Sequence, residues 1–252
     1  MLRLIFKGVF ILFIFFTVSL KSQVINIENK RFLNDSNGWV GNVDFSFNVF
    51  NNTQQVIQFS NAARVQYQKN RSRFILLNDL NLIKAGNTDF ANAGYQHFRY
   101  NYKISKWVTM EAFTQTQYNP VLKLDFRYLL GAGPRLKLLK KEKSRIYIAA
   151  LYMYEYDDII NDDVNLHEHR LSSYLTCSFS LFKSMDLTST TFYQPNLENT
   201  ADYRIANDSG LEIHINKHLN FKSTFNMLYD TKQPIGIPDL VYSFRNGLSI
   251  KF

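Results

Sequence analysis

The stretch at 240–252, LVYSFRNGLSIKF, alternates apolar and polar side chains along its length. One face carries Tyr242, Phe244, Leu248, Ile250 and Phe252, and the other carries Ser243, Arg245, Gly247, Ser249 and Lys251. A period of two is the pattern of a β-strand with one apolar face. The stretch therefore predicts an amphipathic strand, and the fold depends on how often this pattern recurs.

The same alternation recurs along most of the chain, and helical periodicity is almost absent from residue 38 onward. Turn-rich gaps separate about twelve such runs: 38–50, 55–68, 72–83, 89–103, 106–118, 122–137, 144–156, 167–182, 185–195, 201–216, 218–230 and 240–252. In the run 122–137, Leu122, Leu124 and Phe126 fall on the face opposite Arg127 and Arg135.

Two architectures produce such alternation, and the length of the runs separates them. Strands of soluble sandwiches average about 5–6 residues, whereas transmembrane barrel strands need about 9–11 tilted residues. The runs match the second class, and a polar lumen accounts for charges at mid-strand. We predict an all-β fold, a single antiparallel transmembrane β-barrel of about twelve strands over 38–252, with no second domain.

The gaps between runs support this prediction. If both chain ends lie in the periplasm, the periplasmic gaps are KNRS, KISK, LLKKEK, FKSM and NKH, all short. The gaps on the cell surface are NNTQ, AGNTD, YNPVL, DDIINDDVNL, PNLENT and DTKQPIGIPD, which are mostly longer. Short periplasmic turns and longer outer loops are typical of outer-membrane barrels.

The N-terminus and the composition indicate export. Arg3 and Lys7 precede an apolar run too short for a spanning helix, which favours a signal peptide at 1–22 over an uncleaved anchor, followed by a polar lead-in at 23–37. The chain has 22 Phe and 15 Tyr at a mean hydropathy of −0.23, as strands and membrane interfaces favour. Removing Arg3, Lys7 and Lys21 lowers the net charge from +8 to +5. This surplus is spread out, so nucleic acid is not a predicted partner.

Several stretches resemble a family of outer-membrane proteins of unknown function, some of whose members are labelled salt-induced outer membrane proteins. They are GWVGNVDFSFNV, FANAGYQHFRYNYKISKWVTMEAFTQTQYN, LLGAGPRLKL, LYMYEYDD and HEHRLSSYL, and their aromatic character resembles the Bacteroidota branch. The resemblance covers about 38–252. It implies a barrel in the outer membrane of a Gram-negative bacterium, and it supplies no reaction, ligand or catalytic residue.

Charged residues on the predicted inward face are the candidate functional residues. They are Asp44, Arg64, Asp79, Arg99, Glu111, Asp125, Arg127, Arg135, Glu155, Arg170, Arg204, Asp208, Glu212, Lys222 and Arg245. One hypothesis is a narrow channel or facilitator for small solutes or ions, lined by these charges. The alternative is a non-conducting structural or stress-response protein of the envelope, whose lumen charges pair with one another.

Other motifs predict no further chemistry. His167 and His169 near the acidic loop DDIINDD lack a fixed third ligand, so no metal site is predicted. Ser173 lies four residues from His169, about 13 Å along a strand, too far for a nucleophile–base pair. We therefore predict no catalytic residue, no cofactor and no enzyme, and the lone Cys177 is assigned to packing.

Two features remain. The stretch LLGAGPR, with Gly131, Gly133 and Pro134 in a strand, predicts a kink or bulge of the barrel wall near the periplasmic rim. The last strand is predicted to pair with the first, and Phe252 resembles the terminal aromatic that the barrel-assembly machinery recognises. The predicted partners are this machinery and the lipid of the outer membrane.

Overall fold

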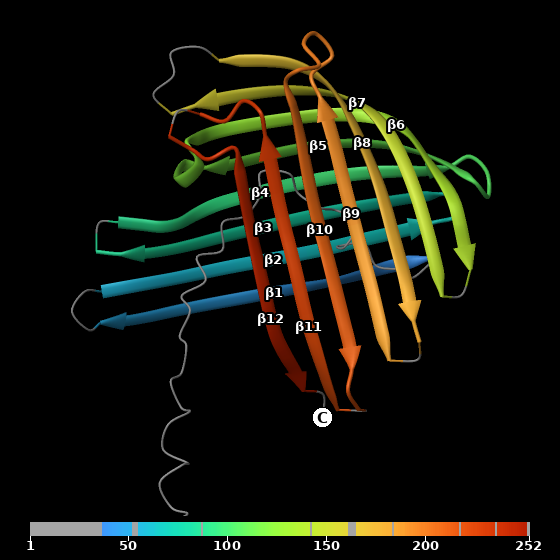
Figure 1. The fold of residues 1–252 in the computed structure, drawn as a ribbon, viewed down its shortest axis with the longest axis horizontal. Helices are drawn as coiled ribbons and strands as arrows, with labels where there is room; N and C mark the ends of the chain where they lie inside the picture. Colours follow the sequence, from blue (N-terminus) through green and yellow to red (C-terminus); the bar gives the residue numbers. More distant parts are fainter. Residues whose placement is uncertain are drawn as a thin grey trace, which may run out of the picture.

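The computed structural model describes residues 37–250 except 52–54, 87, 142, 161–164, 183, 217 and 235. It contains twelve strands, β1 Gly38–Asn51, β2 Gln55–Lys69, β3 Ser72–Ala85, β4 Thr88–Lys103, β5 Val108–Asn119, β6 Leu124–Lys141, β7 Ser144–Ile159, β8 Leu166–Leu181, β9 Met185–Pro195, β10 Tyr203–His214, β11 Leu219–Asp230 and β12 Leu240–Ile250 (Figure 1). Residues 1–36 and Phe252 lie outside the described part. No helix in the described residues is long and apolar enough to cross a membrane.

All twelve strands form one antiparallel sheet in which each strand pairs with its neighbours in the chain, which confirms the predicted all-β fold class. β1 and β12 are the two edges of this sheet over the described residues. We call the end of the sheet that holds the β2–β3 and β4–β5 turns the turn end. The opposite end, called the loop end, holds the longest connections, 196–202 and 231–239, and a 3₁₀ turn at Pro120–Leu122.

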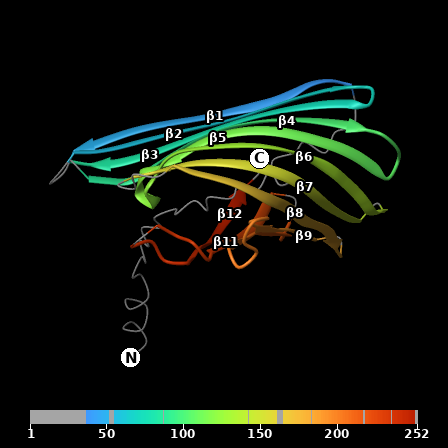
Figure 2. The same cartoon turned by 90° about the horizontal axis from the view of Figure 1, so that it is seen from above.

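The sheet curls strongly, so that β1–β5 lie over β9–β12 in Figure 2. Side chains of strands that are not neighbours meet within the curl. Arg204 on β10 contacts Glu155 on β7 across β8 and β9, and the Tyr174 hydroxyl on β8 donates to Glu111 on β5 at 2.7 Å. Such contacts require these side chains to project from the concave side, which we call the inner face.

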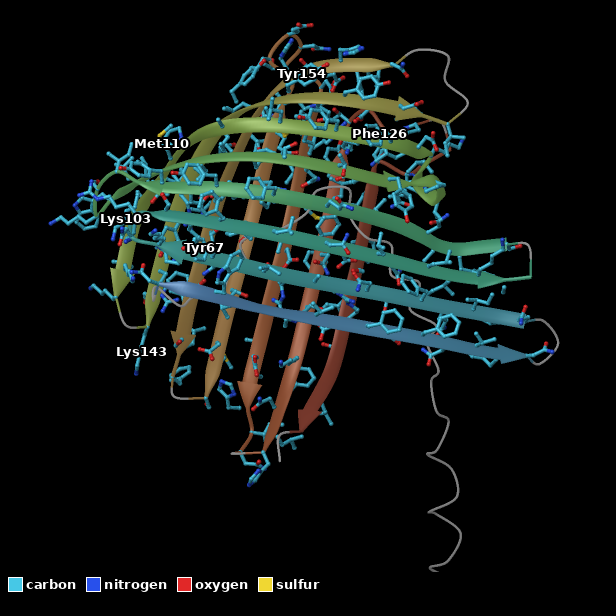
Figure 3. The ribbon with its side chains drawn as sticks, turned by 180° about the vertical axis from the view of Figure 1, so that it is seen from behind. Tyr67, Lys103, Met110, Phe126, Lys143 and Tyr154 are labelled. Carbon is cyan, nitrogen blue, oxygen red and sulfur yellow. The ribbon has the colours of Figure 1, made fainter. Side chains whose placement is uncertain are left out.

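The outer face is apolar and is rimmed by aromatic side chains at both ends of the strands. At the turn end the Trp39 and Tyr67 rings lie 4.6 Å apart, and the Tyr67 and Phe74 rings 6.3 Å apart. At the loop end the rings of Tyr193 and Tyr203 are 5.9 Å apart. Figure 3 places Tyr67 near one end of its strand and Phe126 at the opposite end of the sheet.

The start of β6 corrects the predicted run 122–137. Leu122 belongs to the 3₁₀ turn, and both Leu122 and Leu124 are buried, 4% and 0% exposed, instead of facing outward with Phe126. The cause is a bulge, because Leu124 pairs with Asn119 and Arg127 pairs with Gln117. The additional residue between them reverses the alternation, so Leu124 and Arg127 are both buried while Asp125 is exposed.

Of the kink or bulge predicted at LLGAGPR, the bulge is wrong. On the β5 side the register runs without a shift from Gly131 to Arg135, and β6 instead has shifts at Leu124/Phe126 and Lys137/Leu139. Gly133 has a different role, since a Cβ at this position would lie 2.6 Å from the Leu151 Cα and still closer to the Ala150 carbonyl. The glycine therefore lets β7 approach β6 closely.

Candidate functional site

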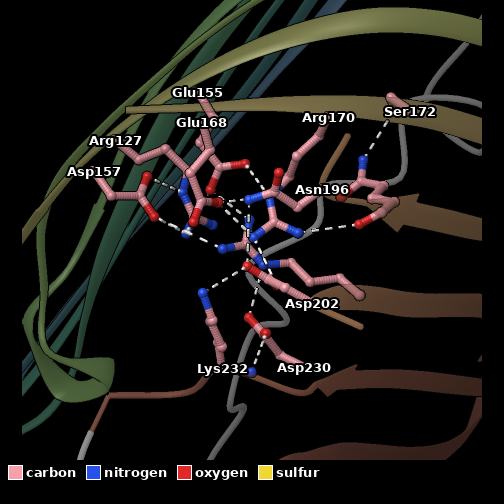
Figure 4. Close-up of polar contacts among 12 residues, drawn as sticks. Arg127, Glu155, Asp157, Glu168, Arg170, Ser172, Asn196, Asp202, Asp230 and Lys232 are labelled. Atoms are coloured by element: carbon pink, nitrogen blue, oxygen red, sulfur yellow. Dashed lines mark hydrogen bonds and ion pairs between the residues drawn. The ribbon is translucent and has the colours of Figure 1, made fainter. Parts of the chain in front are cut away.

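A network of nine charged residues lies on the inner face near the loop end (Figure 4). This nine-charge network consists of Arg127 on β6, Glu155 and Asp157 on β7, Glu168 and Arg170 on β8, Asp202 in the β9–β10 loop, Arg204 on β10, Asp230 at the end of β11, and Lys232 in the β11–β12 loop. It contains five acids and four bases, so its charges nearly balance.

Glu155 is the centre of this network. Arg127 Nη2 lies 3.0 Å from its Oε1, Arg204 Nη1 contacts the same oxygen, and Arg170 Nε lies 3.5 Å from Oε2. Glu155 is 1% exposed. A buried carboxylate is costly unless it is paired, and three guanidinium groups offset that cost here. The arrangement holds four strands of the curled sheet together.

The rest of the network fastens two loops to the sheet. Arg170 Nη2 lies 2.9 Å from Asp202 Oδ1, and Arg204 Nε lies 2.7 Å from Asp230 Oδ2. Lys232 Nζ, which is largely exposed, reaches Asp202 Oδ2 at 3.3 Å. Burial acts to raise the pKa of Asp202, but Arg170 and Lys232 outweigh it and lower this pKa below its usual value.

An apolar layer lies beside the network on the same inner face. It consists of Phe113, Leu129, Ala149, Leu151, Met153, Tyr174, Phe192, Ala206 and Leu228, all buried. Gly131 leaves the space that the Phe113 ring fills, since a Cβ there would lie 2.5 Å from the ring. The interior along β5–β11 is therefore filled with side chains over the part nearer the loop end.

A second buried group of charges lies on the other side of the apolar layer, toward the turn end. Arg99 Nη1 is 2.9 Å from Glu111 Oε2, and Arg135 Nε is 3.9 Å from Glu111 Oε1. The Arg135 guanidinium also lies 3.9 Å over the Tyr147 ring, a cation–π contact. With the Tyr174 hydroxyl, Glu111 is surrounded by donors and is 1% exposed.

Short polar side chains line part of the remaining inner face, and we call this part the polar wall. Its rows, read from the strand register, are Thr190, Asp208, Asn226 and Ser243 on β9–β12, Thr188, Gly210 and Thr224 on β9–β11, and Ser46, Ser60 and Asn81 on β1–β3; the second row continues on β12 with Arg245, which is not counted in the wall. Asp208 has the same strand parity as Arg204, so both project from the same face. No member of the wall has a side chain larger than that of asparagine.

The predicted inward charges divide into three groups by exposure. Buried are Asp79, Arg99, Glu111, Arg127, Glu155, Arg170 and Arg204, half-buried are Arg64, Arg135, Asp208 and Glu212, and exposed are Asp44, Asp125, Lys222 and Arg245. The structure brings Arg127, Glu155, Arg170 and Arg204 into one network and Arg99, Glu111 and Arg135 into the second group. The exposed members lie mostly on the edge strands and β11.

Five network residues are missing from the sequence-based candidates: Asp157, Glu168, Asp202, Asp230 and Lys232. The sequence assigned Asp157 to a loop, but β7 continues to Ile159 and the Arg127 Nε donates to Asp157 at 2.6 Å. The parity of Met153 and Glu155, extended by two residues, would have indicated this position. Asp202 and Lys232 belong to loops, where the alternation of a strand does not apply and cannot indicate which side chains face inward.

The histidine and serine residues of the HEHR region are engaged on the outer face. The Tyr152 hydroxyl lies 2.5 Å from His169 Nδ1, and the Tyr154 hydroxyl lies 2.8 Å from His167 Nδ1. The Ser173 hydroxyl donates to the Tyr193 carbonyl at 2.7 Å. Within the described residues, no group of three or more His, Cys, Asp or Glu side chains could hold a metal ion.

The curled twelve-stranded meander with a polar inner face and an apolar outer face defines a barrel-type all-β protein. The chain belongs to the family described as "Protein of unknown function, DUF481", which matches residues 43–252. Comparison with curated proteins gives no match.

Two solved porins are similar in part. The NanC porin has a TM-score of 0.48 at 10% identity, covering 85% of this chain and 98% of its own. The KdgM porin, which is also solved in complex with disordered oligogalacturonate, has a TM-score of 0.42 at 12% identity, covering 84% of this chain and 99% of its own. At these scores the two porins say nothing about what this protein binds or transports.

Proposed function

We propose that this protein is an outer-membrane β-barrel of a Gram-negative bacterium that provides a narrow pathway for small polar solutes. The apolar outer face supports the location. Phe45 is 68% exposed, Phe244 57% and Leu248 68%. Contiguous exposed apolar surface is unfavourable in water and favourable in lipid.

The dimensions of the apolar face fit a bilayer. On β6 it extends from Phe126 to Leu136, both exposed. Ten residues at about 3.3 Å each, tilted by about 35–45°, span roughly 23–27 Å along the membrane normal. The apolar band of outer-membrane barrels is about 25 Å tall. The aromatic side chains at both strand ends take the place of the two interfacial girdles.

The polar wall is the observation that carries the proposed pathway. The interior along β5–β11 is filled near the loop end by the apolar layer and the ion pairs, whereas the wall, farther from the loop end on β9–β12 and on β1–β3, presents hydroxyl and amide groups on short side chains. Charges of both signs accompany it, including Asp44, Asp208, Lys222 and Arg245. Mixed signs favour neutral or zwitterionic solutes over ions of one charge.

Single-channel recording in planar bilayers tests this pathway. We expect small conductance steps from the refolded full chain, and Asn226→Trp, which places an indole on the polar wall, to lower them. Phe225→Trp is the matched control, since it changes the neighbouring residue on the outer face. Absence of steps at every salt concentration, or equal conductance of the two variants, would contradict the pathway.

The alternative is a non-conducting envelope protein, and the nine-charge network favours it. Together with the apolar layer, the network closes much of the interior near the loop end. Swelling of proteoliposomes in small sugars separates the two candidates. Swelling supports the pathway, and its absence together with intact folding supports the non-conducting protein.

Assembly is the remaining part of the proposal. The C-terminal strand would be recognised by the barrel-assembly machinery through Phe252, which lies outside the described residues. Deletion of Phe252 should lower the amount of protein inserted into the outer membrane, whereas deletion of a single residue from the 231–239 loop should not. Equal insertion of the two variants would remove this role.

A further inference from the structure

The two free edges of the sheet carry complementary patterns. β1 and β12 each have one neighbouring strand over the described residues, which leaves a row of backbone donors and acceptors on each. Free edges are sites of further strand pairing. The Arg245 side chain on β12 is exposed, has no hydrogen bond or ion pair in the described part of the chain, and belongs to the polar face of its strand.

We propose that β12 closes on β1 in a single register in which Arg245 lies directly opposite Asp44 on the inner face. This inference rests on the proposed membrane barrel and specifies its seam. Each edge strand pairs with the other edge strand of the same chain. Pairing with an edge strand of a second copy is the alternative that the experiment distinguishes.

The register of the sheet limits where the seam can close. The row of directly paired residues that starts at Asp44 passes through Ala62, Asp79, Tyr95, Gln117, Arg127, Asp157 and Leu166. When the registers of the later strand pairs are applied in turn, the row reaches β12 at the position of Gln233, if β12 is extended that far. Arg245 lies about twelve residues along β12 from that position. A barrel closed with Arg245 opposite Asp44 therefore has a stagger of about twelve residues.

A stagger of this size matches barrel geometry. About twelve residues at about 3.3 Å, set against twelve strands about 4.8 Å apart, give a strand tilt of roughly 35°. Staggers of about 14 and 16 give roughly 39° and 43°, and all three lie within the usual 35–45°. An odd stagger is excluded, because it would turn one strand's apolar face into the lumen.

Both faces of the seam favour the smallest of the three staggers. It sets Arg245 against Asp44 inside, and opposite charges directly across a strand pair are favourable. Outside, it sets Phe45 against Phe244 and Phe47 against Tyr242, two aromatic pairs. The next stagger sets Arg245 against Ser46 and keeps one aromatic pair, Phe47 against Phe244. The largest sets Arg245 against Asn48 and makes no aromatic pair.

Cysteine cross-linking reads the register directly, because a disulfide needs Cβ atoms about 3.8 Å apart. In a Cys177→Ser background, Ser243→Cys is combined with Ser46→Cys, Asn48→Cys or Phe50→Cys, which test the three staggers in turn. We expect the Ser46 combination to form an intramolecular disulfide at least tenfold faster than the others. A faster Asn48 or Phe50 combination, or a disulfide-linked dimer, would overturn the proposed register.

A charge exchange gives an independent readout. Asp44→Arg places two like charges opposite each other and should lower the midpoint of thermal unfolding, while the double variant Asp44→Arg, Arg245→Asp should recover it. Equal midpoints in the single and double variants would contradict the ion pair. If the seam has the proposed register but the protein shows no conductance, the proposed pathway is contradicted and the proposed register is not. The two proposals can therefore be tested separately.

Discussion

Replacing Glu155 with glutamine tests whether the nine-charge network stabilises the fold. Glu155→Gln keeps the shape of the side chain and removes the negative charge that Arg127, Arg170 and Arg204 share. Removing one partner of a buried ion pair costs about 3–5 kcal/mol, and here three buried guanidinium groups lose the carboxylate that they share. We expect a loss of this size in the free energy of unfolding.

Equilibrium unfolding in urea, on protein refolded into lipid vesicles and followed by tryptophan fluorescence, measures this loss. Glu212→Gln is the matched control, since Glu212 pairs with Lys222 at 3.7 Å while its side chain is 31% exposed. The pair is open to solvent, with the Lys222 side chain 50% exposed, and ion pairs at the surface contribute about 0–1 kcal/mol. If the two substitutions lower the unfolding free energy equally, or if Glu155→Gln stabilises the protein, the network does not hold the sheet together.

Three further outcomes follow from the structure. Gly133→Ala should destabilise the protein by several kcal/mol, the range of severe backbone strain, because the added Cβ would collide with β7. Gly247→Ala is the control, since nothing lies within 4 Å of a Cβ at that position. Equal unfolding midpoints of the two variants would contradict the close approach of β6 and β7. The pKa of Asp202 is lowered in the folded state, so its contribution to the free energy of unfolding is present above the ordinary Asp pKa of about 3.9 and is lost as the pH falls through the lowered value. Asp202→Asn should therefore flatten the acid side of a stability–pH profile. Leu130→Arg on the outer face should cost about 2–4 kcal/mol in vesicles if that face meets lipid, and an effect within about 0.5 kcal/mol would place it in water.

The alternation of the sequence predicts the strands well and the contents of the interior poorly. All twelve strands follow from a period of two, because lipid or water on one face and a different environment on the other impose it. The same rule assigns Leu124 to the wrong face, because a bulge between Leu124 and Arg127 shifts the register by one residue. A bulge has no period and is set by the neighbouring strand.

The network shows a second limit of the pattern. Parity identifies Glu155 and Arg204 as residues of the same face, but it cannot tell that they meet across two intervening strands. That contact depends on the curl of the whole sheet. Asp202 and Lys232 come from loops and are missed for the same reason. The chemistry of the candidate site is therefore a product of tertiary structure.

The wide spread of the network along the chain has a consequence for the order of folding. Its charges come from β6 through the loop after β11, so none of the central contacts of Arg204 exists until the last third of the chain has folded. Contacts of such high sequence separation form late and slowly. Until then, Arg127 and Glu155 need water around them, which must leave when β10 and β11 arrive. We expect insertion to stall in chains truncated before β10, with a hydrated, loosely curled sheet as the intermediate that accumulates.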